Sequence, residues 1–79
     1  MVSNFFEVML MVKINGNDTD TAGKTVTEYL KIANYDTRTI VVEINEEIVD
    51  KAKYNETILN NGDIVEIISF MGGGWLIGK

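Results

Sequence analysis

The sequence predicts one α+β domain, a mixed β-sheet with one main helix packed on one face. Three observations predict it: an early hairpin signal at Asn15 and Gly16, an amphipathic helix over residues 26–33, and a later set of β-branched runs. A hairpin, one helix and returning strands suit a sheet covered on one side. A chain of 79 residues supports one modest core, and the absence of Pro leaves every strand possible.

The first apolar run, residues 8–14, ends at Asn15 and Gly16. Asn-Gly between extended runs is a strong hairpin signal, because both residues accept positive φ. We therefore predict a polar return strand over residues 17–22, closed by Gly23.

The helix signal begins at Thr25, which with Glu28 matches a capping box. Apolar residues follow at helical spacing: Val26, Tyr29, Leu30 and Ala33. This stripe predicts a helix over residues 26–33 with Asn34 as its C-cap. Val26, Leu30 and Ala33 should pack on the sheet.

Residues 39–44 form the densest β-branched run and predict the third strand. A turn at 45–46 leads into a short strand, 47–49, and residues 64–71 predict the last strand. Between them, residues 50–61 are polar, with three apolar side chains expected to tuck under as a short helical turn: Tyr54, Ile58 and Leu59. The predicted order, β-β-α-β-β-β, is that of the β-grasp, or ubiquitin-like, fold.

Alternation along the third and last strands divides their side chains between two faces. Those expected in the core are Ile40, Val42, Ile44, Val65 and Ile67. Those expected on the open face are Val41, Glu43, Glu66, Ile68 and Phe70. An apolar patch rimmed by acids predicts a partner-binding surface, with Met71 beside it. The alternative is that residues 50–61 or the N-terminal residues cover the patch.

Composition excludes several functions. The chain has no Cys and no His, so imidazole bases, thiolates and the usual zinc ligands are missing, and enzymatic activity of its own is not expected. The net charge of −5 with scattered bases argues against nucleic-acid binding. The acids at 43, 46, 47 and 50 lack the spacing of a calcium loop, so we expect no metal. No apolar run is long enough to span a membrane, and we expect a cytoplasmic protein.

Three consecutive glycines, Gly72, Gly73 and Gly74, follow the last predicted strand. Without Cβ atoms they form the narrowest peptide thread, and residues 71–74 reach about 13 Å when extended. Such a thread could place a terminal carboxyl in a partner's active site. The alternative is a turn into a short strand over 75–77. A phosphate loop is excluded, because the Lys-Ser/Thr pair of that motif is missing.

Residues 61–74 resemble the end of the ThiS sulfur carriers: a Gly-Asp turn, a Val-Glu-Ile strand, a Phe, one apolar residue and glycines. Residues 12–16, 25–30 and 41–49 resemble the family's opening strand and turn, helix start and central hairpin. The family more often has Asn-Gly where this chain has Asn45 and Glu46. The resemblance covers residues 11–74. The related MoaD carriers share the fold and the glycine end, with less of the central pattern.

The resemblance implies a carrier that partner enzymes act upon. A ThiF-like adenylating enzyme would use ATP to activate the carboxylate of Gly74, and a sulfur donor would convert it to a thiocarboxylate. A ThiG-like synthase would then use the sulfur to build the thiazole ring of thiamine. The carrier itself would bind no cofactor. Glycine would leave the reacting carbonyl unhindered.

Two departures from the family accompany this expectation. Residues 75–79 follow Gly74, so a processing protease would have to remove them before Gly74 became a terminus. Residues 1–10 precede the usual start, and either Met11 is that start or they lengthen the first strand. We therefore divide the chain into residues 1–10, a β-grasp domain over 11–71, and a tail over 72–79. The alternative functions are another sulfur carrier of MoaD type and a non-transferring β-grasp interaction module.

Overall fold

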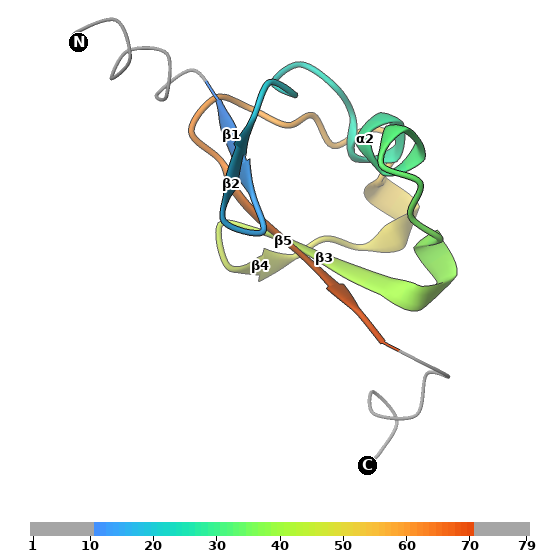
Figure 1. Ribbon diagram of the computed structural model, residues 1–79. Coiled ribbons are helices and arrows are strands. Elements are labelled where there is room, and N and C mark those ends of the chain that lie inside the picture. Colours follow the sequence, from blue (N-terminus) through green and yellow to red (C-terminus); the bar gives the residue numbers. More distant parts are fainter. Residues whose placement is uncertain (1–10, 71–79) are drawn as a thin grey trace, which may run out of the picture.

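The chain folds around a mixed five-stranded sheet in the order β2-β1-β5-β3-β4, in a computed structural model that describes residues 11–70 (Figure 1). The elements along these residues are β1 (Val12–Ile14), β2 (Asn17–Thr19), α2 (Val26–Ile32), η1 (Thr37–Thr39), β3 (Ile40–Ile44), β4 (Glu47–Ile48), η2 (Lys51–Lys53) and β5 (Ile64–Ser69). The expectations for residues 1–10 and 71–79 lie outside the described residues.

β5 lies in the centre of the sheet, parallel to β1 and antiparallel to β3. β2 and β4 are the edges, each paired antiparallel with its hairpin neighbour. Helix α2 crosses one face of this sheet (Figure 1). The β-grasp prediction is confirmed. The strand that leads into the glycine tail is therefore held on both sides.

Two tight turns fix the hairpins. Asn15 and Gly16 have φ of 51° and 85°, and Asn45 and Glu46 have φ of 52° and 73°. Positive φ at both central residues is the type I′ geometry, whose twist matches that of paired strands. Both predicted turns are confirmed. The return strand is shorter than predicted and ends at Thr19. The Thr19 hydroxyl donates to the Val12 carbonyl (2.8 Å).

The start of α2 is confirmed as a capping box. The Glu28 N–H donates to Thr25 Oγ1 (3.0 Å), and the Thr25 N–H donates to Glu28 Oε1 (2.9 Å). The Val26 N–H, which has no partner within the helix, donates to the Thr57 carbonyl (2.9 Å). The segment after η2 is thereby tied to the beginning of the helix.

Helix α2 ends one residue earlier than predicted, and its C-cap is not Asn34. The helix ends at Ile32, Ala33 is the C-cap, and Asn34 follows with φ of 67°. The Tyr35 N–H donates to the Leu30 carbonyl and the Asn34 N–H to the Lys31 carbonyl, which is a Schellman turn. Ala33 is exposed, and Tyr35 packs against the core instead, because the turn redirects the chain toward the sheet.

The core joins one face of the sheet to α2 and to the segment after η2. Its buried members are Val12, Ile14, Val26, Leu30, Ile40, Val42, Tyr54, Leu59, Val65 and Ile67. The inward assignments in β3 and β5 are confirmed, with Ile44 half-buried against the core. Ile58 was expected inside and is 48% exposed. It pairs with Thr25 in an isolated bridge, where adjacent side chains alternate, so Leu59 points inward and Ile58 outward.

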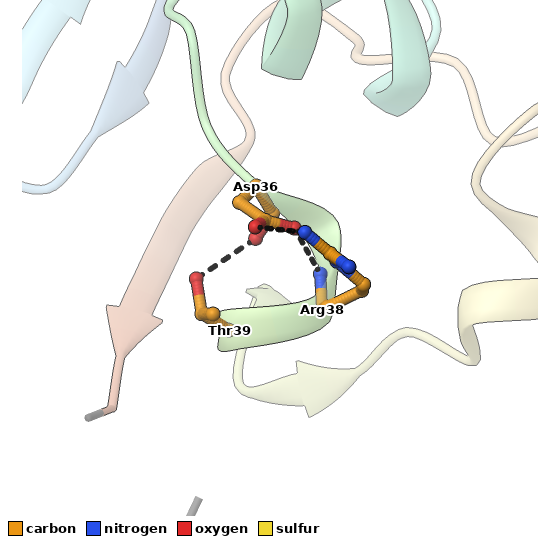
Figure 2. A network of polar contacts seen from close by, with 3 residues as sticks. All are labelled: Asp36, Arg38 and Thr39. Carbon is orange, nitrogen blue, oxygen red and sulfur yellow. Dashed lines mark hydrogen bonds and ion pairs between the residues drawn. The ribbon is translucent and has the colours of Figure 1, made fainter. Parts of the chain in front are cut away.

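A polar network closes the turn between α2 and β3 (Figure 2). Asp36 Oδ1 accepts from the backbone N–H of Arg38 (2.9 Å), and the guanidinium of Arg38 bonds both carboxylate oxygens. The Thr39 hydroxyl donates to the Asp36 carbonyl (3.0 Å). Thr39, expected in the third strand, therefore lies in η1.

We expect Asp36 to titrate unusually low. Hydrogen bonds from the Arg38 side chain and backbone lower the pKa of Asp36 to about 2. A lowered pKa in the folded state contributes stability above the unfolded value of about 4, and this contribution disappears as the pH falls through about 2. The melting-temperature difference between the parent and Asp36→Asn should shrink as pH falls over this range. A difference that stays constant would contradict the assignment, and NMR of the carboxyl carbon gives the pKa directly.

Candidate functional site

The candidate site is the face of β3 and β5 that is turned away from α2. Their antiparallel register places Val41 opposite Ile68 and Glu43 opposite Glu66. Residues directly opposite in a sheet project to the same side. Phe70 directly follows β5, and its N–H donates to the Thr39 carbonyl (2.9 Å), so the strand pairing continues to the last described residue. We call these five residues the open-face patch.

The patch residues lie outside the core, as their alternation predicted. Glu66 is exposed, and the other four are half-buried: Val41, Glu43, Ile68 and Phe70. None of them belongs to the core cluster. Their role in binding a partner stays a prediction, as does that of Met71, which lies outside the described residues together with Gly72, Gly73 and Gly74.

Two further apolar side chains lie on this face. Ile64 is 52% exposed and shares the alternation of Glu66 and Ile68. Ile48 is 70% exposed and is the partner of Glu43 in the β3–β4 pairing. Alternation alone could have identified Ile64. To place Ile48 on this face, one would also have to recognise the two-residue turn as type I′, because the turn type sets which residues of the hairpin face each other.

The open-face patch carries two negatively charged side chains, those of Glu43 and Glu66. Glu43 and Glu66 directly face each other, and like charges at opposed positions destabilise a sheet. Within residues 11–70 neither takes part in an ion pair, whereas Lys13 and Asp18 on the β1–β2 side pair at 3.1 Å. Two unpaired carboxylates beside apolar side chains are suited to a partner that presents a cation next to an apolar group.

Within residues 11–70, no group of three or more acidic side chains is placed to hold a metal ion. Burial raises the pKa of the Tyr54 phenol, which lies in the core. A groove of ≈ 590 Å³ runs between β4 and residues 57–63, lined in part by Ile48 and Ile58, and contains none of the patch residues. No described helix is long and apolar enough to cross a membrane.

The comparisons with known proteins agree with this geometry. A sulfur carrier protein ThiS from Bacillus subtilis is 36% identical over 66 residues, covering 81% of this chain and all of its own length. A crystal structure of the thiamine biosynthesis protein ThiS from Geobacter metallireducens superposes with a TM-score of 0.69 at 29% identity, covering 82% of this chain and 100% of that one.

A longer protein also matches. A thiazole synthase from Paramagnetospirillum magneticum is 42% identical over 62 residues, which are 77% of this chain and only 19% of the synthase. This chain thus spans about a fifth of that relative. A family model described as the ThiS family matches residues 11–74, from the residue before β1 to the third glycine. The chain belongs to the ThiS family.

Proposed function

We propose that this chain is a sulfur carrier for thiazole formation in thiamine biosynthesis, with the carbonyl carbon of Gly74 as the site that carries sulfur. The observation behind the proposal is the family match over residues 11–74, which ends at the third glycine. The B. subtilis and G. metallireducens relatives are covered over their full length by this chain. Residues 75–79 therefore follow the region that the family model covers.

The proposed chemistry requires little of the carrier itself. A carboxylate oxygen of Gly74 would attack the α-phosphorus of ATP, and pyrophosphate would leave. Sulfide released by the donor would then attack the acyl-adenylate carbon, and AMP would leave as the C–S bond forms, giving the thiocarboxylate. No Cys is needed, since the sulfur bonds to the chain's own carbonyl carbon, and the chain has none. The adenylating enzyme would supply the nucleotide site.

The open-face patch is the proposed docking surface for the ThiF-like adenylating enzyme. It lies along β5, the last strand before the glycines in the sequence, so a partner bound there would also be near the residue at which the tail begins. Glu43 and Glu66 would accept a cationic side chain of the partner. The thiazole synthase relative supports a connection to a ThiG-like enzyme, because a stretch similar to this carrier occurs within a thiazole synthase chain.

The proposal is tested with two forms of the chain. A form ending at Gly74 should support ATP–pyrophosphate exchange by a ThiF-like enzyme, and the 79-residue form should not. With a sulfur donor present, mass spectrometry should show the shorter form gaining the difference between a sulfur and an oxygen atom. Equal exchange from both forms would refute the need for processing. No exchange from the shorter form would refute the carrier function.

Phe70→Ala should weaken binding to the adenylating enzyme and leave the melting temperature nearly unaltered. Aromatic anchors dominate interface energies, and Phe70 lies outside the core cluster. Calorimetric titration of the 79-residue chain with the enzyme measures the effect. Ile58→Ala, which truncates an exposed side chain in another part of the molecule, is the control. A Phe70→Ala chain that unfolds would show that this side chain supports the fold instead.

A further inference from the structure

Two asparagine side chains hold β5 from opposite sides. Asn15 and Asn45 occupy the same position in two type I′ turns, with φ of 51° and 52°. Each carboxamide forms hydrogen bonds with β5 or with Asp63, the residue before it. Asn45 Oδ1 accepts from the Ile64 N–H (3.0 Å), and its Nδ2 donates to Asp63 Oδ1 (3.0 Å). Asn45 thus holds the beginning of the strand.

Asn15 holds β5 further along, on the side of β1. Its Oδ1 accepts from the Ile67 N–H (2.7 Å), and its Nδ2 donates to the Ile67 carbonyl (3.3 Å). A single carboxamide therefore satisfies both backbone groups of one residue, as a neighbouring strand would. Both contacts are part-buried and join residues 52 positions apart.

The parallel pairing explains why this contact matters. β1 and β5 are paired only at Lys13 with Ile64 and at Ile14 with Val65. The Asn15 N–H still donates to the Val65 carbonyl (2.9 Å), but the chain then turns into the hairpin. The side-chain oxygen takes the place that the next backbone carbonyl would have in a continued parallel ladder. Within the described residues, no further bond to β5 beyond Ile67 comes from the β1 side.

We infer that Asn15 is a positioning residue for the glycine tail. This inference rests on the proposed function. Ile67 lies between the part of β5 that is paired with β1 and Phe70, the last residue before the tail. With the Asn15 side chain in place, β5 is held on both sides as far as Ile67, and only residues 68–70 are held by β3 alone. Without it, the stretch held by β3 alone begins at residue 66, and a longer stretch can bend over a wider range of directions. Asn15 therefore raises the fraction of molecules whose tail leaves the domain in the direction that the adenylating enzyme requires.

Asn45 provides a matched control, because it has the same turn geometry and the same kind of amide contact at the other end of β5. Glycine accepts the positive φ of both turns, so Asn15→Gly and Asn45→Gly remove an amide without straining a turn. Both variants should lose similar amounts of thermal stability. Only Asn15→Gly should affect tail presentation.

Hydrogen exchange in the 79-residue chain tests the clamp. Asn15→Gly should accelerate exchange of the Ile67 amide, and Asn45→Gly that of the Ile64 amide. The adenylation assay uses the form that ends at Gly74, which retains every described residue. Its KM should rise about three- to tenfold in Asn15→Gly, the effect of losing one net hydrogen bond from the competent population, with kcat unchanged. Asn45→Gly should keep the parent KM.

A KM that rises equally in both variants would overturn the positioning role, as would an unchanged KM in Asn15→Gly. Asn15→Asp is the second variant, since it keeps an acceptor for the Ile67 N–H, while its second oxygen, unlike Nδ2, cannot donate to the Ile67 carbonyl. It should show a smaller increase in KM than Asn15→Gly, and an equal or larger increase would contradict the inference. Failure of the proposed function would look different, because the unsubstituted form would not be adenylated at all.

Discussion

Gly73→Val, in the form that ends at Gly74, should abolish adenylation without lowering the free energy of unfolding. A valine side chain restricts the φ values open to the thread and widens it, so a partner site that admits only the narrow glycine thread would exclude it. The core within residues 11–70 is formed without residue 73, so we expect the free energy of unfolding to be unchanged. Initial rates of ATP–pyrophosphate exchange and a denaturant unfolding curve measure the two effects separately.

The corresponding control is a valine placed after the thread. Leu76→Val in the 79-residue chain, followed by cleavage after Gly74, should yield a carrier as active as the parent, because the changed residue is removed. A rate of ATP–pyrophosphate exchange equal to that of the parent in Gly73→Val would show that the partner does not enclose the tail. The glycines would then act only as a linker.

Leu30→Ala should lower the free energy of unfolding by about 2–5 kcal/mol, the range for truncating a buried leucine. Leu30 is 1% exposed and is among the largest fully buried side chains. It lies on the face of α2 that packs against the sheet, and its carbonyl also accepts the Tyr35 N–H (2.9 Å). Urea denaturation monitored by circular dichroism measures the loss.

Ile32→Ala is the matched control, because Ile32 is in the same helix and is 67% exposed. It should cost no more than about 0.5 kcal/mol, as expected for a surface position. A loss below about 1 kcal/mol for Leu30→Ala would mean that the face of the helix is misassigned, because the free energy of transferring the removed groups out of the core alone exceeds that value.

The parts of the fold that could be predicted are those with local causes. The capping box at Thr25 and the Asn-Gly turn each depend on a few adjacent residues, and both are confirmed. Ala33 was assigned to the core from helical spacing, but the Schellman turn ends the helix one residue earlier and brings Tyr35 inward. That turn depends on Asn34 adopting positive φ, which composition alone does not require.

The candidate site also has parts that the local sequence predicts and parts that depend on tertiary structure. Alternation placed Val41, Ile68 and the two glutamates on the open face without knowledge of which strands pair. That Glu43 faces Glu66 required the register between β3 and β5, which is a tertiary property. The Asn15 contact with Ile67 joins residues distant in sequence, and no local pattern signals it.

The central position of β5 has a consequence for biosynthesis. Because the sheet order is β2-β1-β5-β3-β4, the two hairpins have no shared strand pairing until β5 inserts between β1 and β3. β5 is also the last strand in the described residues. A nascent chain therefore exposes two unpaired strand edges on the ribosome, where they can pair wrongly with other chains. Closure by a late, non-local strand is also slow. Because β5 shortly precedes the glycines in the sequence, we expect the sheet to be completed only when nearly the whole domain has been synthesised.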